Sequence, residues 1–146
     1  MSDSDSTKMG KLSENEEEYL EQLLVMEENG VVLATISAVS EGLKIKAPSA
    51  VQMLKKLEEK GLVNYKKRKG VELSNEGRTA ATHIIRNHRL IETLMKKTLK
   101  DEVDEDVVCG IEHHMTAEFA NAVCTLLEHP RNCPHGNPIP KGECCK

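Results

Sequence analysis

The sequence predicts a mainly α-helical protein in which a winged helix-turn-helix is joined by a long connector helix to a second helical domain. The chain has 146 residues, 38% hydrophobic but only 2% aromatic, so its core has to be built from aliphatic side chains, which suit packed helices better than a β-sandwich. Helix-start and helix-stop signals recur along the chain, interrupted once by a strand–turn–strand pattern. An unbroken helical pattern of about 25 residues follows that interruption.

The first half of the chain carries the signals of three helices. Ser13 caps the first of them, Glu16 completes a capping box, and the Asn-Gly pair at 29–30 ends the helix. A short helix is predicted over residues 35–41. The next helix has Pro48 in its first turn, where the fixed φ of proline favours helix initiation. A tight turn between these last two helices predicts a helix-turn-helix.

The stretch "LVNYKKRKGVELS", residues 62–74, predicts two short strands around a basic turn at Lys69-Gly70, which is the wing. Ser74 then caps the connector helix, and two further helices are predicted over residues 104–114 and 116–127. The predicted domains are a disordered N-terminal tail (1–11), the winged helix-turn-helix (12–73), a helical domain (74–130) and a Cys/Pro/Gly-rich, loop-like C-terminal tail (131–146).

The net charge of −4 conceals a basic segment. Residues 43–69 carry nine basic and two acidic side chains, a local charge of +7 that leaves −11 elsewhere. The basic segment could bind an anionic polymer, and the acidic remainder could bind cations. The alternative is that both are solvated charged surfaces. In a helix-turn-helix the second helix enters the major groove, so we expect Gln52 to meet a base edge and Ser49 a base or phosphate. The predicted DNA-binding residues are Lys46, Pro48, Ser49, Gln52, Lys55, Lys56, Lys66, Lys67, Arg68 and Lys69.

No apolar run approaches the ~20 residues that span a bilayer, and the first residues are polar, unlike a signal peptide. Five cysteines, an odd number, then indicate thiols and metal ligands in place of a disulfide framework. We therefore expect a cytoplasmic protein with reduced cysteines.

The stretch "VVCGIEHHMT", residues 107–116, gathers a thiol, a carboxylate and imidazoles. Cys109, Glu112 and His113 are spaced i, i+3, i+4 and so share one helix face, and His88 and Glu92 repeat the i, i+4 spacing on the connector. Mixed sulfur, nitrogen and oxygen donors suit first-row divalent ions better than Ca²⁺ or Mg²⁺. The alternative for Cys109 alone is a small buried hydrophobe. No H-E-x-x-H motif, nucleophile turn or phosphate loop is found, so an enzyme is not expected.

At these residues the chain resembles the diphtheria toxin repressor family of metal-dependent regulators, including its two-domain manganese-responsive branch. The stretches that carry the resemblance are "EEYLEQLLVMEENG", "APSAVQMLKKLEEKGLV", "LSNEGRTAATHIIRNHRLIE", "CGIEHH" and "HGNPIP". The resemblance implies a helical dimerisation and metal-binding domain and a homodimer that binds a palindromic operator when loaded with divalent metal. We expect neither a membrane nor a small organic substrate as a partner.

Position by position, the resemblance implies a set of metal ligands. Glu105 stands where iron-type members carry a histidine ligand, and the SH3-like third domain of those members is not expected. The ligand set is a hybrid, because Cys109 resembles iron-type members and the two N-terminal glutamates resemble the manganese branch. The implied ligands are Glu18, Glu21, His88, Glu92, Cys109, Glu112 and His113, with Glu105 as a further candidate.

The predicted function is therefore a metal-dependent repressor of metal uptake genes, with Fe²⁺ as the expected ion and Mn²⁺ next. Alternatives are a manganese-responsive repressor of the same type, a non-regulatory metal-binding or buffering protein and, least expected, a zinc hydrolase. The tail offers a second site for Zn²⁺ or an iron–sulfur cluster, with Cys124 as an additional ligand; the alternative is a disordered or redox-sensitive end. The candidate ligands in the tail are Cys133, His135, Cys144 and Cys145.

Overall fold

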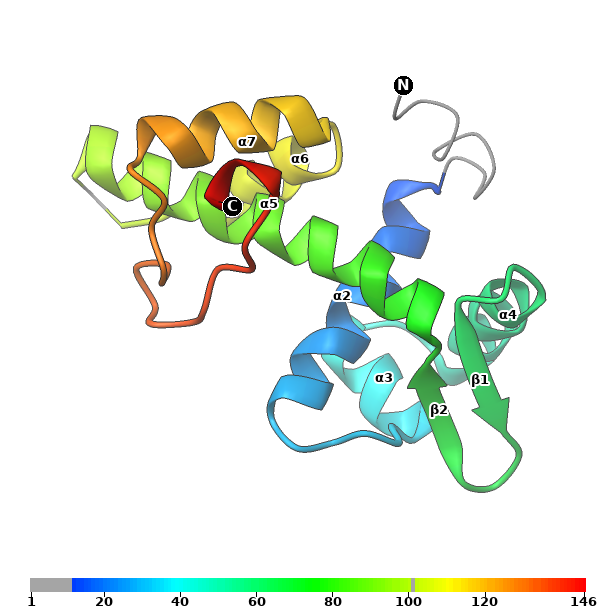
Figure 1. Ribbon diagram of the computed structural model, residues 1–146. Coiled ribbons are helices and arrows are strands. Elements are labelled where there is room, and N and C mark those ends of the chain that lie inside the picture. Colours follow the sequence, from blue (N-terminus) through cyan, green and yellow to red (C-terminus); the bar gives the residue numbers. More distant parts are fainter. Residues whose placement is uncertain (1–11, 101) are drawn as a thin grey trace. The chain divides into compact units, whose positions relative to one another are not determined.

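The structure, a computed structural model, describes residues 12–100 and 102–146 (Figure 1). The predicted disorder of residues 1–11 lies outside the described residues. The mainly helical fold class is confirmed, and the chain divides into two compact units, one ending at Ala81 and one beginning at Thr82. The elements are α2 (Glu14–Glu28), α3 (Ile36–Leu43), α4 (Ala47–Glu59), β1 (Val63–Lys66), β2 (Gly70–Leu73), α5 (Asn75–Leu99), α6 (Glu105–Glu112), α7 (Ala117–Leu126) and the 3₁₀ turn η1 (Glu143–Cys145).

Helix α2 begins with the predicted capping box. Ser13 Oγ accepts a hydrogen bond from the Glu16 backbone N–H at 3.1 Å, and Glu16 Oε1 accepts one from the Ser13 N–H at 2.9 Å. Glu16 is also buried, and its second carboxylate oxygen accepts from Lys60 Nζ at 2.5 Å. The same side chain thus starts α2 and fastens it to the residue that ends α4.

The helix-turn-helix consists of α3 and α4. Thr35 caps α3 by accepting the Ala38 N–H at 3.0 Å, and α3 runs to Leu43, two residues beyond its predicted end. Lys44 then turns the chain with a φ of 58°, and α4 starts at Ala47 with Pro48 in its first turn. The apolar face of α4 is buried in the first unit and leaves its polar face to solvent.

The wing is the antiparallel pair of β1 and β2, seen as two arrows in Figure 1. Its turn occupies residues 67–69, with Arg68 at a φ of 69°, so the prediction of a turn at Lys69-Gly70 was too late in the chain. Gly70 instead begins β2 at a φ of 131°, and a Cβ there would lie 2.6 Å from Ala34 O. That close approach lets Ala34 and Val71 exchange two backbone hydrogen bonds, which attach the part of β2 nearest the turn to residue 34.

In the second unit, α7 lies beside the later part of α5 (Figure 1), and Leu90 of α5 is buried in one cluster with apolar side chains of α7 and of the segment after it. Helix α6 ends at Glu112, with His113 as its C-cap, and is shorter than the predicted 104–114. The segment 131–146 is fastened to α5, because Arg89 Nη1 donates to Pro138 O at 2.6 Å. No helix in the described part of the chain is long and apolar enough to cross a membrane.

The buried carboxylate of Glu16 generates a prediction for stability. Burial opposes its ionisation, but the hydrogen bond and charge of Lys60 outweigh burial and hold the pKa of Glu16 below its ordinary value. Since the folded-state pKa is the lower one, this stabilisation is present at neutral pH and is lost as the pH falls through it. We expect Lys60→Ala to lower the free energy of unfolding in urea by about 1–3 kcal/mol at neutral pH. Lys55→Ala, at an exposed lysine of the same helix, is the control, and equal losses in both variants would contradict the assignment.

Candidate metal centres and nucleic-acid interface

All ten predicted DNA-binding side chains are exposed to solvent. They come from the first turns and solvent face of α4 and from the wing, so the basic segment forms the surface of the helix-turn-helix. Two of its lysines also have carboxylates nearby: Lys56 Nζ lies 3.9 Å from Glu16, and Lys66 Nζ lies 3.7 Å from Glu72. The contact of these ten residues with DNA stays a prediction.

The first metal cluster is built on the end of α6. Cys109 Sγ lies 3.6 Å from His113 Nε2, which in turn lies 4.0 Å from Glu112 Oε2. The predicted i, i+3, i+4 spacing brings a sulfur, a nitrogen and an oxygen donor together, and His88 joins them from α5, with its Nδ1 2.6 Å from Glu112 Oε1. Cys109, His113, Glu112 and His88 thus form a row in which each side chain lies next to the following one.

The carboxylate of Glu112 tests whether these residues fit a cation. Its side chain is 1% exposed, and its Oε2 has no hydrogen-bond partner among the described residues. A buried oxygen without a hydrogen-bond partner is costly, and such an oxygen next to the His113 imidazole fits a bound cation. Mixed S, N and O donors at this point suit Fe²⁺, Mn²⁺, Co²⁺, Ni²⁺ or Zn²⁺.

A second cluster lies on the other side of the same imidazole. His88 Nε2 is 3.1 Å from Glu105 and 3.3 Å from Glu92, whose Oε2 lies 3.0 Å from His135 Nδ1. Burial, followed by the neighbouring Glu92, raises the pKa of Glu105. For Glu92, burial is outweighed by His88 and the other neighbours, which lower its pKa. Glu105 thus occupies the place that the resemblance gave to a histidine, and His135 supplies an imidazole from the segment 131–146.

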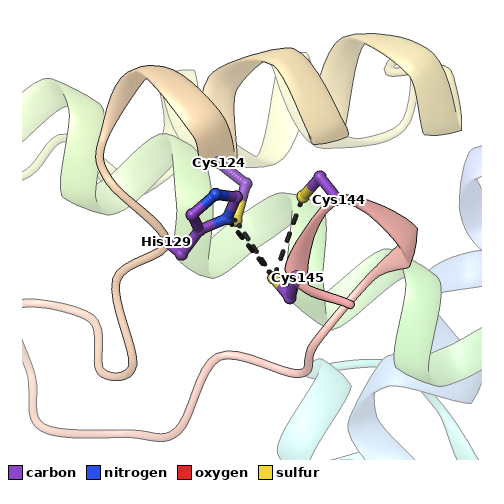
Figure 2. A group of neighbouring side chains, drawn as sticks. All are labelled: Cys124, His129, Cys144 and Cys145. Atoms are coloured by element: carbon purple, nitrogen blue, oxygen red, sulfur yellow. Dashed lines mark hydrogen bonds between the residues drawn. The ribbon is translucent and has the colours of Figure 1, made fainter.

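The structure divides the candidate ligands of the tail between two places. Cys133 and His135 group with Glu92, whereas Cys144 and Cys145 group with Cys124 and with His129, a residue that sequence reasoning missed (Figure 2). All five cysteines are free thiols. Burial raises the pKa of Cys124 to about 12, and a backbone hydrogen bond at Gly142 leads the effects that lower the pKa of Cys145 to about 6. The tail also contains η1, so it is less loop-like than predicted.

Glu18 and Glu21 lie on α2 in the first unit, and both are partly exposed. Their role as ligands stays a prediction that rests on the resemblance.

Two family models match this chain. Residues 11–71 match "Iron dependent repressor, N-terminal DNA binding domain", and residues 74–141 match "Iron dependent repressor, metal binding and dimerisation domain". The chain belongs to the iron-dependent repressor family. The resemblance found in the sequence is thereby confirmed, and the two matched domains correspond to the helix-turn-helix side and the metal-cluster side of the chain.

Individual relatives agree with this family. The diphtheria toxin repressor of Corynebacterium glutamicum is 31% identical over 134 residues, which are 90% of this chain and 58% of the relative. A solved manganese-dependent transcriptional repressor in complex with manganese superposes with a TM-score of 0.80 at 28% identity, covering 88% of this chain and 59% of the other. The hypothetical protein SSo2273 from Sulfolobus solfataricus is 31% identical and superposes with a TM-score of 0.62. The match covers 89% of this chain and 100% of the other. The chain therefore spans about three fifths of the curated repressor that it matches.

The position of His88 between the two clusters generates a prediction. Because its two ring nitrogens face ligands of different clusters, His88→Ala should weaken divalent metal binding at both of them, by about tenfold or more. His83→Ala, at an exposed histidine of the same helix, is the control. Equilibrium dialysis against Co²⁺ measures both affinity and stoichiometry. Unchanged binding by the His88 variant would exclude His88 as a ligand.

Proposed function

We propose that the protein is a DNA-binding repressor whose affinity for its operator depends on divalent metal. The observation that carries the proposal is the buried Glu112 carboxylate, which is hydrogen-bonded to His88 and keeps one oxygen without a partner beside His113. A family with a DNA-binding domain and a metal-binding domain supplies the context for that cluster. Metal bound there would make DNA binding conditional on the metal supply, so that excess metal represses its own uptake genes.

The regulatory ion is proposed to be Fe²⁺ first and Mn²⁺ second. Cys109 contributes a thiolate, a soft donor that Fe²⁺ accepts more readily than Mn²⁺ does. Glu112, His113 and His88 would hold the ion in the second unit, and the resemblance adds Glu18 and Glu21 of α2 to the same centre. Bound metal supplies positive charge where carboxylates otherwise repel one another. Ligands on α2 and on α6 would then couple metal occupancy to the arrangement of the DNA-binding unit.

A homodimer is proposed through α6 and α7. These two short helices expose four large apolar side chains, an arrangement more typical of an interface than of a free surface. Two copies would present two recognition helices to half-sites about one turn of DNA, ~34 Å, apart. A two-fold operator is the expected partner of such a dimer. The exposed apolar residues are Val107, Ile111, Phe119 and Leu126.

The second candidate function is a metal buffer that binds the ion without a DNA response. The basic, exposed surface of α4 and the wing disfavours it, because a buffer has no use for a charge of +7 over 27 residues. A zinc hydrolase is weaker still, since the clusters contain no activated nucleophile motif.

The proposal is tested by selecting ligands from a random duplex library with purified, anaerobic protein and Fe²⁺. We expect a two-fold symmetric site to emerge and its affinity to fall by about 5- to 150-fold when the metal is removed by chelation, which is the range of typical allosteric coupling. Tight metal binding with no DNA retained would favour the buffer. DNA affinity that is indifferent to chelation would contradict metal-dependent repression.

A further prediction separates base reading from phosphate contact. Gln52→Ala should relax discrimination at one base pair by about 1–3 kcal/mol, since an amide on the first turns of α4 can pair with a base edge. Lys67→Ala should weaken binding to all duplexes alike and reduce the salt dependence, because a wing lysine contacts phosphate. Binding isotherms on the selected site and on single-base variants distinguish the two. Uniform losses in both variants would remove Gln52 from the reading residues.

The choice of metal rests on Cys109. The wild type should be activated by Fe²⁺ at a lower free concentration than by Mn²⁺, and Cys109→Glu should shift the preference towards Mn²⁺ while DNA binding is kept, because a carboxylate preserves the number of ligands and suits the harder ion. Anaerobic operator titrations at buffered metal concentrations measure both preferences. A wild type that already responds better to Mn²⁺ would show that its carboxylates outweigh the thiol.

A further inference from the structure

A group of three cysteines and one histidine lies apart from the clusters described above. Cys124 comes from α7, His129 follows the end of that helix, and Cys144 and Cys145 come from η1 (Figure 2). Their four donor atoms all lie within 4.8 Å of one another, although the residues are up to 21 positions apart in the chain. The DNA-binding and metal-sensing roles proposed above use none of the four.

The distances within this group match those around one tetrahedral ion. Zinc–sulfur bonds of about 2.3 Å and zinc–nitrogen bonds of about 2.0–2.1 Å, at tetrahedral angles, place sulfurs about 3.8 Å apart and sulfur and nitrogen about 3.5 Å apart. Cys145 Sγ lies 3.6 Å from Cys124 Sγ and 3.8 Å from Cys144 Sγ. His129 Nδ1 lies 3.4 Å from Cys124 Sγ and 3.5 Å from Cys145 Sγ. Hydrogen bonds between pairs of thiols would also give such distances. Pairwise hydrogen bonds do not, however, explain why four possible metal-ligand atoms lie within 4.8 Å of one another.

The backbone that carries His129 is unfavourable on its own. Glu128 and His129 both have left-handed φ values, 62° and 53°, although neither is glycine. The turn ends α7 by directing the His129 N–H to Cys124 O at 2.8 Å, which brings the imidazole back over the thiol of Cys124. Two successive non-glycine residues keep a left-handed conformation only where other interactions hold them in it. Such strained backbone conformations occur most often at functional sites. A bond from His129 to an ion supplies that constraint.

The charge around the group also fits a bound cation. Arg86 of α5 is buried, and it donates to Cys144 Sγ at 3.3 Å and to Pro140 O at 3.1 Å. Three thiolates and one divalent cation sum to −1, which the guanidinium cancels. Gly142 permits this approach, because a Cβ there would collide with the guanidinium carbon of Arg86. A cavity lined by the four ligands and by Pro130 and Lys141 gives an ion a path to the site.

We propose that Cys124, His129, Cys144 and Cys145 bind one Zn²⁺ as a closed, four-coordinate structural site. Three thiolates and an imidazole form a known type of structural zinc site, and they leave no open position for a substrate. Its role is to fasten η1 to the end of α7 and so to order the segment 131–146. The site is chemically distinct from the sensing clusters, whose carboxylates suit harder ions.

The test uses the full chain, reduced and anaerobic, with Co²⁺ as a spectroscopic substitute for Zn²⁺. Cys109→Ser/Cys133→Ser removes the two thiols that lie in the other metal clusters. In that background we expect the thiolate-to-cobalt charge-transfer band and the strong visible absorption of tetrahedral Co²⁺ to persist. Adding Cys145→Ser should remove most of the remaining charge-transfer intensity, whereas Cys109→Ser alone and Cys133→Ser alone should each leave most of it in place. These spectra do not depend on DNA binding, so they are read independently of the proposed function.

His129→Ala guards against loss by misfolding, because this side chain is exposed. We expect it to weaken Zn²⁺ binding by about tenfold or more, with an unchanged far-ultraviolet circular dichroism spectrum. Native mass spectrometry should find one zinc per chain retained by Cys109→Ser after a chelator wash and none by Cys109→Ser/Cys145→Ser. The proposal is overturned if Cys109→Ser retains no zinc, or if adding Cys145→Ser leaves the cobalt spectrum unchanged.

Discussion

The imidazole of His88 imposes the constraint on which the metal-binding unit depends. Its Nδ1 is 2.6 Å from a carboxylate oxygen of Glu112, while its Nε2 faces oxygens of Glu105 and Glu92 at 3.1 and 3.3 Å. A neutral imidazole has one N–H and cannot donate on both sides. The conflict is removed if the ring carries a second proton, if one of the carboxyl groups is protonated, or if a cation lies on one side of the ring. A metal-bound histidine commonly donates its other N–H to a carboxylate. Since carboxylates lie at both ring nitrogens of His88, either nitrogen could bind a metal while the other donates to a carboxylate.

The same crowding explains how metal can act as a signal. Carboxylates that share a small volume repel one another. The pKa of Glu105 is raised by burial, then by a hydrogen bond with Glu92 and by the charge of Glu92. In the proposed function, a divalent ion would offset this repulsion and would stabilise the arrangement of the chain that presents the full ligand set. Regulation then needs only that this arrangement binds DNA better than the others do, because a ligand shifts an equilibrium by its difference in affinity for the two states.

Local signals in the sequence were sufficient for most elements. The capping box of Ser13 and Glu16, the proline in the first turn of α4 and the 25-residue pattern of α5 each depend on neighbours in the chain, and each appears in the structure. The grouping of Cys109, Glu112 and His113 follows from helix periodicity for the same reason. The predicted position of the wing turn was wrong because Gly70 is not part of the turn. Glycine is needed there for a tertiary contact, since a Cβ would lie too close to Ala34 O. His129 carried no signal at all, since its position depends on two left-handed residues, and the division of the tail ligands depends on the path of the segment over α5.

The most direct measurement of the central claim, that metal and operator DNA are coupled on this chain, is the affinity of the protein for Fe²⁺ or Mn²⁺ with and without saturating operator. Thermodynamic linkage requires each ligand to strengthen the other by the same factor. Operator should lower the dissociation constant of the metal by the same factor by which metal lowers the dissociation constant of the operator, about 5- to 150-fold. A metal affinity that operator leaves unchanged would contradict it.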